Sequence, residues 1–200
     1  MPKADWVKVT PAQGSGDYQV SVASQAEHTG RNARNTVITW KAVNCADVPR
    51  NVIQAGKPEY VDIADTASAP KEGKVVTISG ESNSKKLTFS LGAGDLELTL
   101  PENYTANSVQ TANGAEITGD PGALQMYAFS ISFTVGANED IEAKTRQIIV
   151  TDEGGHQDVC LLTLVAGDAY LTVAEGDINL DYLGTPVAVQ VESNTEWTVE

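Results

Sequence analysis

The stretch that decides the fold is Phe129-Ser130-Ile131-Ser132-Phe133-Thr134-Val135, in which apolar side chains alternate with small polar ones. Successive side chains of a β-strand point to opposite faces of a sheet. A period of two therefore predicts a strand with one face in a core and the other in water. The same alternation occurs in five other short runs, at residues 18–22, 36–40, 87–91, 96–100 and 187–191.

Residues that favour turns separate these runs. Examples are Gly14-Ser15-Gly16-Asp17 and Gly119-Asp120-Pro121-Gly122, which carry the residue types that sharp turns need. No long segment shows the 3.6-residue period of an amphipathic helix. Short strands at regular spacing predict an all-β chain built as an antiparallel β-sandwich.

The composition limits the partners of the chain. Of its 200 residues, 41% are apolar and 20% are charged, which is enough apolar material for a core. The 27 acidic and 13 basic residues give a net charge of −14, and such a charge repels nucleic acid and anionic membranes. No run approaches the roughly 18 apolar residues of a membrane helix. We therefore expect no nucleic-acid partner and no membrane insertion.

Several motifs recur about 111 residues further along the chain. Five matches in the same order predict one structural unit that is used more than once. They pair Ala55-Gly56 with Ala166-Gly167, Tyr60 with Tyr170, Ser82-Asn83 with Ser193-Asn194, Tyr18-x-Val20-x-Val22 with Phe129-x-Ile131-x-Phe133, and Arg34-x-x-Val37-Ile38-Thr39 with Arg146-x-x-Ile149-Val150-Thr151.

The repeat predicts three parts. Residues 1–56 look like the back part of a unit, residues 57–167 like a whole unit with an insertion near 101–126, and residues 168–200 like the front part of a further unit. The absence of an apolar signal core then indicates excision from a longer, extracytoplasmic protein. Half a sandwich exposes unpaired edges. We therefore expect residues 168–200 to complete residues 1–56 of a neighbouring molecule, head to tail.

A set of motifs follows one order: Ser193-Asn194-x-x-Trp197, Trp6, Gly14-Ser15-Gly16, Val20 and Val22, Arg34 to Thr39, and Val52-Ile53-Gln54-Ala55-Gly56. This order resembles that of the BACON domain, an immunoglobulin-like sandwich of surface and secreted proteins in Bacteroidetes. The resemblance implies tandem immunoglobulin-like sandwiches, a place at the cell surface or outside the cell, and binding of glycans or mucin-type surface carbohydrate. It implies no particular set of binding residues, and it is weaker in the middle unit, where Leu87 replaces a Trp.

The three tryptophans fall into two groups. Trp6 and Trp197 share a repeat position with Leu87, and a position that takes Trp or Leu is expected in a core. Trp40 corresponds to Asp152, and a position that accepts Asp is expected near the surface or at a strand end. An exposed ring can stack on the apolar face of a sugar. Trp40 is therefore a candidate carbohydrate platform; the alternative is an aromatic partly covered at a strand end.

Tyr104 is the second candidate, because it lies in the insertion beside Glu102 and Asn103. Long loops are uncommon in compact domains and often carry function. An aromatic ring next to an amide and a carboxylate has the groups that read sugar hydroxyls. The alternative is that Tyr104 anchors the insertion to the sandwich.

Catalytic chemistry has little support in the sequence. His28 and His156 adjoin no suggestive nucleophile and lie at no ligand spacing from Cys45 or Cys160, and no hydrolase, zinc or phosphate-loop motif is present. We expect no catalytic residue, metal site or cofactor, and two unpaired thiols. The predicted function is a non-catalytic module that binds carbohydrate. The alternatives are a spacer or adhesion module without a ligand, and an accessory part of a surface glycan-degrading enzyme.

Overall fold

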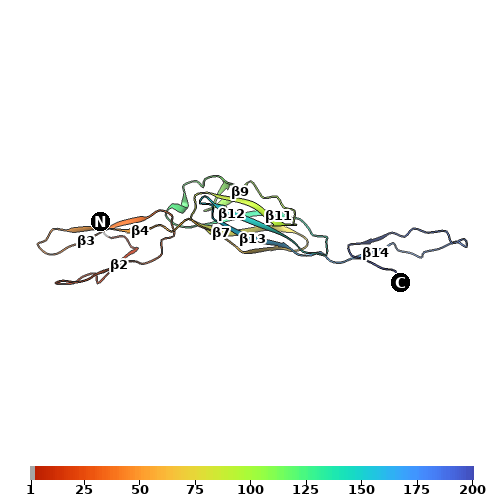
Figure 1. The fold of residues 1–200 in the computed structure, drawn as a ribbon, viewed down its shortest axis with the longest axis horizontal. Coiled ribbons are helices and arrows are strands. Elements are labelled where there is room, and N and C mark those ends of the chain that lie inside the picture. The colour runs from red at the N-terminus through yellow and green to blue at the C-terminus, as the bar shows by residue number, and fades with distance from the viewer. Residues whose placement is uncertain (1–2) are drawn as a thin grey trace.

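The computed structural model describes residues 3–200 as an elongated, all-β chain (Figure 1). Within these residues the only helix is η1 (Pro121–Ala123), a single 3-10 turn. Residues 3–56, here the N-terminal segment, lie at one end and residues 168–200, the C-terminal segment, at the other (Figure 1). Residues 57–167, the middle domain, lie between them. The all-β prediction is confirmed.

The middle domain contains two sheets. Its strands are β5 (Val61–Ile63), β6 (Thr66–Ala69), β7 (Lys74–Ser82), β8 (Leu87–Gly94), β9 (Asn103–Ala106), β10 (Val109–Ala112), β11 (Tyr127–Val135), β12 (Lys144–Asp152) and β13 (Gln157–Leu164). One sheet has the order β10-β9-β11-β7-β5 and the other β6-β13-β12-β8. The pairs are antiparallel except that β6 runs parallel to β13, which departs from the purely antiparallel arrangement that the sequence predicts.

The two sheets share one core, as in a β-sandwich. Phe129, Ile131 and Phe133 of β11 point into it and are each at most 5% exposed, and Ile148 and Val150 of β12 are fully buried on the facing sheet. Burying a side chain of this size stabilises a fold by about 1.5–3 kcal/mol. The alternation predicted for residues 129–135 is therefore the pattern that holds the middle domain together.

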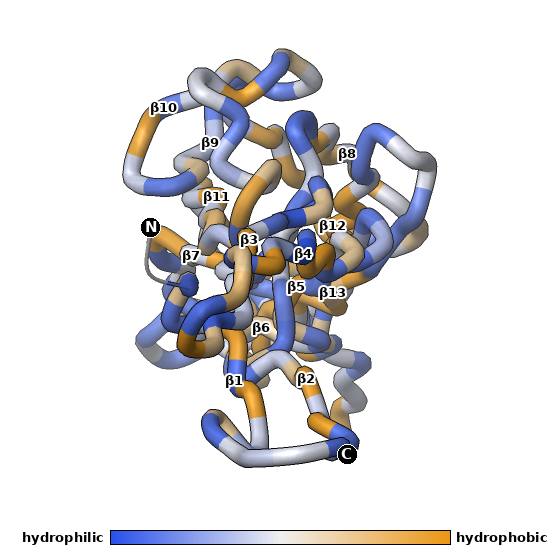
Figure 2. Tube along the Cα trace, turned by 90° about the vertical axis from the view of Figure 1, so that its left-hand side faces the viewer, coloured by the Kyte–Doolittle hydropathy of each residue, from blue (hydrophilic) through white to orange (hydrophobic). Residues whose placement is uncertain are grey.

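The two end segments form only hairpins within residues 3–200. β1 (Val7–Thr10) pairs with β2 (Ser21–Ser24), β3 (Arg34–Trp40) with β4 (Val48–Gln54), and β14 (Leu171–Val173) with β15 (Val191–Ser193). Each pair is a separate two-stranded sheet. The backbones of the two N-terminal hairpins are separate when viewed from their end of the molecule (Figure 2), and side chains connect them, because the Ser24 hydroxyl of β2 donates to the Gln54 amide oxygen of β4 at 3.0 Å. A two-stranded sheet is marginally stable by itself.

Three of the predicted strands are shortened or absent. The run at 18–22 becomes regular only from Ser21, and the run at 187–191 only at Val191. Residues 96–100 form no strand although they lie beside β11. The runs at 18–22 and 187–191 each have at most one hydrogen-bonded neighbour. A second neighbouring strand, which would hold the whole run in a regular strand, is missing.

The sequence predicts that Trp6, Leu87 and Trp197 share one core position. Of these three residues, only Leu87 is fully buried. Trp197 is 49% exposed. Trp6 is half-buried, with the guanidinium carbon of Arg34 4.6 Å from the centroid of its ring. Trp6 and Leu87 are also not equivalent, because β8 pairs with β12 whereas β1 pairs with β2. The prediction that both tryptophans are buried is wrong.

Candidate functional site

Trp40 ends β3 beside the turn that joins β3 to β4. Its side chain is 38% exposed and lines two adjoining hollows of about 270 and 570 Å³. Tyr18, which is 69% exposed, lines the smaller hollow with it. Two accessible aromatic rings therefore share one concave surface of the N-terminal segment.

Polar groups border the same surface. Gln13 lines both hollows, and Lys3 and Lys41 line the larger one. The Lys41 ammonium lies 2.9 Å from the Asp47 carboxylate in an exposed ion pair. The Gln13 amide can both donate and accept hydrogen bonds, and it lies next to apolar ring faces. This combination suits a ligand rich in hydroxyl groups. Trp40 as a carbohydrate platform stays a prediction.

The strand-end place predicted for Trp40 and its counterpart Asp152 is confirmed, because Trp40 ends β3 and Asp152 ends β12. The surface place is wrong for Asp152, which is only 4% exposed. Its carboxylate accepts the backbone N–H of His156 at 2.8 Å and lies 2.8 Å from Nδ1 of the same residue. Asp152 also lies opposite Leu87 across the β8–β12 pair. This strand end is thus covered in the middle domain and open in the N-terminal segment.

Tyr104 is a core residue, and its prediction as a sugar platform is wrong. It is 2% exposed on β9, and its ring centroid lies 5.0 Å from that of Phe89. Burial raises the pKa of its hydroxyl. Glu102 and Asn103 lie beside it on the exposed surface. They belong to the middle domain and Trp40 to the N-terminal segment, so the four candidates form no common site.

The inserted residues 101–126 are folded onto the rest of the molecule. β9 and β10 extend the larger sheet beyond β11. After them, Gly122 accepts the backbone N–H of Arg31 at 2.9 Å, and the Arg31 guanidinium lies 2.6 Å from the Asp120 carboxylate. The insertion thus braces the N-terminal segment against the middle domain.

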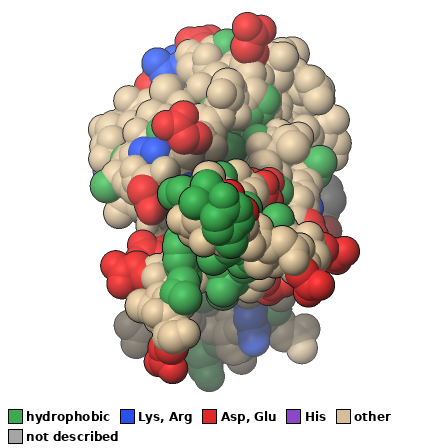
Figure 3. Space-filling model, turned by 90° about the vertical axis from the view of Figure 1, so that its right-hand side faces the viewer, with side chains coloured by type: hydrophobic (Ala, Val, Ile, Leu, Met, Phe, Trp, Pro, Cys, Tyr) green, Lys and Arg blue, Asp and Glu red, His purple; other side chains and the backbone are tan. Residues whose placement is uncertain are grey.

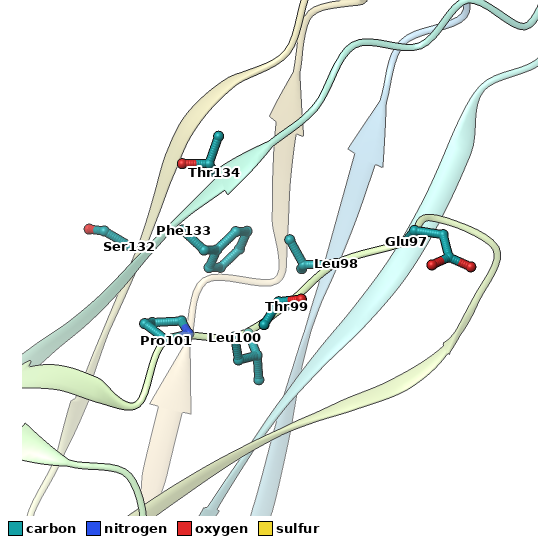
Figure 4. Close-up of a pocket in the computed structure, with 8 residues that line it drawn as sticks. All are labelled: Glu97, Leu98, Thr99, Leu100, Pro101, Ser132, Phe133 and Thr134. Carbon is teal, nitrogen blue, oxygen red and sulfur yellow. The ribbon is translucent and has the colours of Figure 1, made fainter.

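A hollow of about 640 Å³ lies between β11 and residues 97–101 (Figure 4). Phe133 and Leu98 point toward one another there, while Glu97 points away (Figure 4). Glu97 is the only titratable side chain of its lining, so the hollow brings together no acid–base pair. Among residues 3–200, no three His, Cys, Asp or Glu side chains are placed to hold a metal ion.

Asn83 makes the most extensive polar contacts at the boundary between the N-terminal segment and the middle domain. It is fully buried. Its amide nitrogen lies within hydrogen-bond distance of the carbonyl oxygens of Thr29 (3.3 Å), Lys57 (3.3 Å) and Pro58 (3.2 Å), and its oxygen accepts the backbone N–H of Tyr60 at 3.0 Å. One side chain therefore ties the N-terminal segment to the first residues of the middle domain.

Asn194 makes matching contacts at the boundary with the C-terminal segment. Its amide donates to the carbonyl oxygens of Glu139 and Asp168, both at 2.9 Å, and its oxygen accepts the backbone N–H of Tyr170 at 3.0 Å. These partners lie 110 or 111 residues after those of Asn83. The same arrangement of hydrogen bonds thus occurs at both boundaries.

Strand registers agree at the two boundaries as well. Val61 lies opposite Ser82 in the β5–β7 pair, and Leu171 lies opposite Ser193 in the β14–β15 pair. Each serine hydroxyl donates to the carbonyl oxygen of the tyrosine that precedes the first strand, at 2.7 and 2.9 Å. The Ser-Asn motif therefore has one geometry in both places.

The Ala-Gly motif marks the same boundaries. A Cβ atom on Gly56 would overlap the carbonyl oxygen of Arg31, and one on Gly167 would come within 2.6 Å of the carbonyl oxygen of Asn138. Glycine permits this close approach of two backbones. The sequence repeat also divides the chain directly after these two glycines, but the close backbone contacts at both junctions join residues that no local pattern connects.

Comparison with known proteins gave no relative: a scan against models of protein families and a search of curated proteins found no match. Within residues 3–200, no helix is long and apolar enough to cross a membrane.

Proposed function

We propose that this chain is a non-catalytic, extracytoplasmic module of a surface or secreted protein, in which immunoglobulin-like sandwich units resembling BACON domains follow one another end to end as a spacer. The observation that carries the proposal is the matching set of contacts made by Asn83 and Asn194. An amide that bonds to the end of one part and the start of the next restrains the angle between them, whereas a flexible linker does not.

The insertion supports the same role. A ligand-binding loop would present its aromatic residue to solvent, but Tyr104 is buried in the core. The residues after β10 instead contact the N-terminal segment through Asp120 and Gly122. The longest extra segment of the middle domain thus strengthens a junction.

The rigidity of this junction is directly measurable. Spin labels at Asn51→Cys and Thr134→Cys, in a Cys45→Ser background and in dilute solution, report the distance between the N-terminal segment and the middle domain. We expect one narrow distance distribution, which Asn83→Ala broadens at least twofold. Asn113→Ala is the matched control, because Asn113 bonds only within the middle domain, to Phe89. A broad distribution before any junction substitution would contradict a spacer role.

A second role, carbohydrate binding, is favoured by the exposed pair Trp40 and Tyr18 around one hollow. On a glycan array, Trp40→Ala should weaken any saturable binding at least tenfold, which is about 1.4 kcal/mol. Tyr182→Ala is the control, because Tyr182 is 96% exposed in the other end segment. Binding that survives Trp40→Ala would remove this surface from consideration and leave the spacer role unaffected.

A further inference from the structure

We propose that the two end segments complete one another between copies of this chain. Residues 185–193 of one molecule pair with the open edge of β2 in a second molecule, and together the segments rebuild the sandwich seen in the middle domain. This inference does not rest on the spacer role, and it competes with carbohydrate binding, because the pairing covers both Tyr18 and Trp40.

The pairing of β7 with β11 provides the template. These strands run antiparallel from Lys74 opposite Val135 to Ser82 opposite Tyr127. The repeat makes residues 185–193 the counterpart of β7 and residues 16–24 the counterpart of β11. Within residues 3–200, β2 pairs with β1 alone and residues 185–190 are in no strand. Each counterpart therefore has an edge free for the other.

The register carried over from the middle domain brings apolar residues together at three consecutive inward positions. In the middle domain Ile131 lies opposite Ile78, and Phe133 opposite Val76. Shifting both strands by 111 residues places Tyr18 opposite Val191, Val20 opposite Val189, and Val22 opposite Val187. An offset of one residue would turn all these side chains outward.

In the single chain three of these six residues are exposed, and the other three are half-buried. Tyr18 is 69%, Val22 40% and Val187 49% exposed, whereas Ile78 and Ile131 are each 1% exposed. Hydrophobic side chains gather on the end that carries the C-terminal segment (Figure 3). Covering such a surface is the main driving force for association in water.

A second contact follows from the other sheet. Asp152 lies opposite Leu87 in the middle domain, and their counterparts are Trp40 and Trp197. The two tryptophans, 38% and 49% exposed in the single chain, come together in the completed sandwich. Aromatic pairs of this kind contribute about 0.5–1.5 kcal/mol beyond the area they bury.

Charge favours the pairing of unlike ends. Residues 1–56 contain six basic and four acidic side chains, whereas residues 168–200 contain seven acidic and no basic ones. The first segment is therefore positive and the second strongly negative. Two copies of the C-terminal segment repel each other, and unlike segments attract.

Within one copy of this chain the two end segments do not meet (Figure 1). The end segments lie at opposite ends of the elongated chain (Figure 1), and the contacts of Asn83 and Asn194 fix both junctions. A head-to-tail contact of this kind joins molecules into open chains or closed rings.

Sedimentation over a range of concentrations tests the proposal. We expect the mass to rise from that of the 21.1 kDa monomer to multiples of it. Val189→Asp, which places a charge on the inward face, should keep the protein monomeric. Gln190→Asp, the neighbouring outward position, should associate as the unmodified chain does. A mass that stays at one chain up to the solubility limit would overturn the proposal and leave the open edges to some other partner.

Disulfide trapping tests the register. Thr77 and Ser132 lie opposite one another with their hydroxyl oxygens 2.8 Å apart on the exposed face, and their counterparts are Ala188 and Ser21. Opposed residues have Cα atoms about 4.5–5.5 Å apart, within the reach of a disulfide. In a Cys45→Ser background, Ser21→Cys with Ala188→Cys should give a ladder of covalent oligomers. Equal yields from the displaced pair Ser21→Cys with Gln190→Cys would overturn the proposed register.

Discussion

Leu87 in the middle domain and Trp197 in the C-terminal segment occupy corresponding positions 110 residues apart, yet Leu87 is fully buried and Trp197 is 49% exposed. The same contrast separates Ile131 of β11 from its counterpart Val20, which is only half-buried. The alternating pattern decides which way each side chain points. Burial also requires the facing sheet, and within residues 3–200 only the middle domain has both of its sheets complete.

The largest expected difference is between alanine substitutions at Leu87 and at Trp197. Leu87→Ala should lower the free energy of unfolding of the middle domain by about 2–5 kcal/mol, because it opens a cavity in a closed core. Trp197→Ala should change it by less than about 0.5 kcal/mol in dilute solution. Urea unfolding at a concentration where the chain is monomeric measures both, and losses of similar size would mean that the two positions are equally packed.

Alkaline pH should weaken the middle domain selectively. Burial raises the pKa of the Cys160 thiol from 9.0 to about 11, so the folded state favours the protonated form. Ionisation of this thiol therefore leaves the free energy of unfolding unchanged below about pH 9. As the pH rises from 9 toward 11, the free energy of unfolding falls by up to about 1.4 kcal/mol per pH unit.

Urea unfolding between pH 8 and pH 11 measures this slope. Cys160→Val, which keeps an apolar side chain of similar size but cannot ionise, is the control and should flatten the slope. Some decline should persist in the control, because burial also raises the pKa of Tyr104 and Tyr127. An unchanged slope would show that Cys160 does not contribute.

The smallest expected difference concerns the two free thiols. Cys45 is exposed in the N-terminal segment and Cys160 is buried in the middle domain. A thiol reagent at pH 8 should modify Cys45 at least tenfold faster, because the thiolate is the reactive form and burial suppresses it at Cys160. Similar rates would indicate that the middle domain opens readily.

Several strands could be predicted because their pattern and their partners agree. Residues 36–40, 87–91 and 129–135 fall within β3, β8 and β11. The runs at 18–22 and 187–191 have the same alternation but are mostly irregular, because pairing depends on neighbours that a local pattern does not describe. Whether an alternating run forms a regular strand therefore depends more on its partner strands than on its period.

The candidate site was less predictable. Tyr104 has polar neighbours in the sequence, yet the pleat of β9 turns its ring into the core. The sequence marks Asn83 only as part of a repeat. Its contact with Thr29 joins residues 54 positions apart, and no local pattern predicts such a hydrogen bond. Trp40 alone among the four candidates combines an aromatic ring with a concave, accessible surface.

Hydrogen exchange at low and high protein concentration tests most directly whether the end segments are two halves of one sandwich. Amides in β7 and β11 should exchange slowly at both concentrations, because their ladder is complete. Amides of residues 18–24 and 185–193 should exchange rapidly in dilute solution and become protected together as the concentration rises. Exchange in these two stretches that does not change with concentration would contradict the completion of one molecule by another.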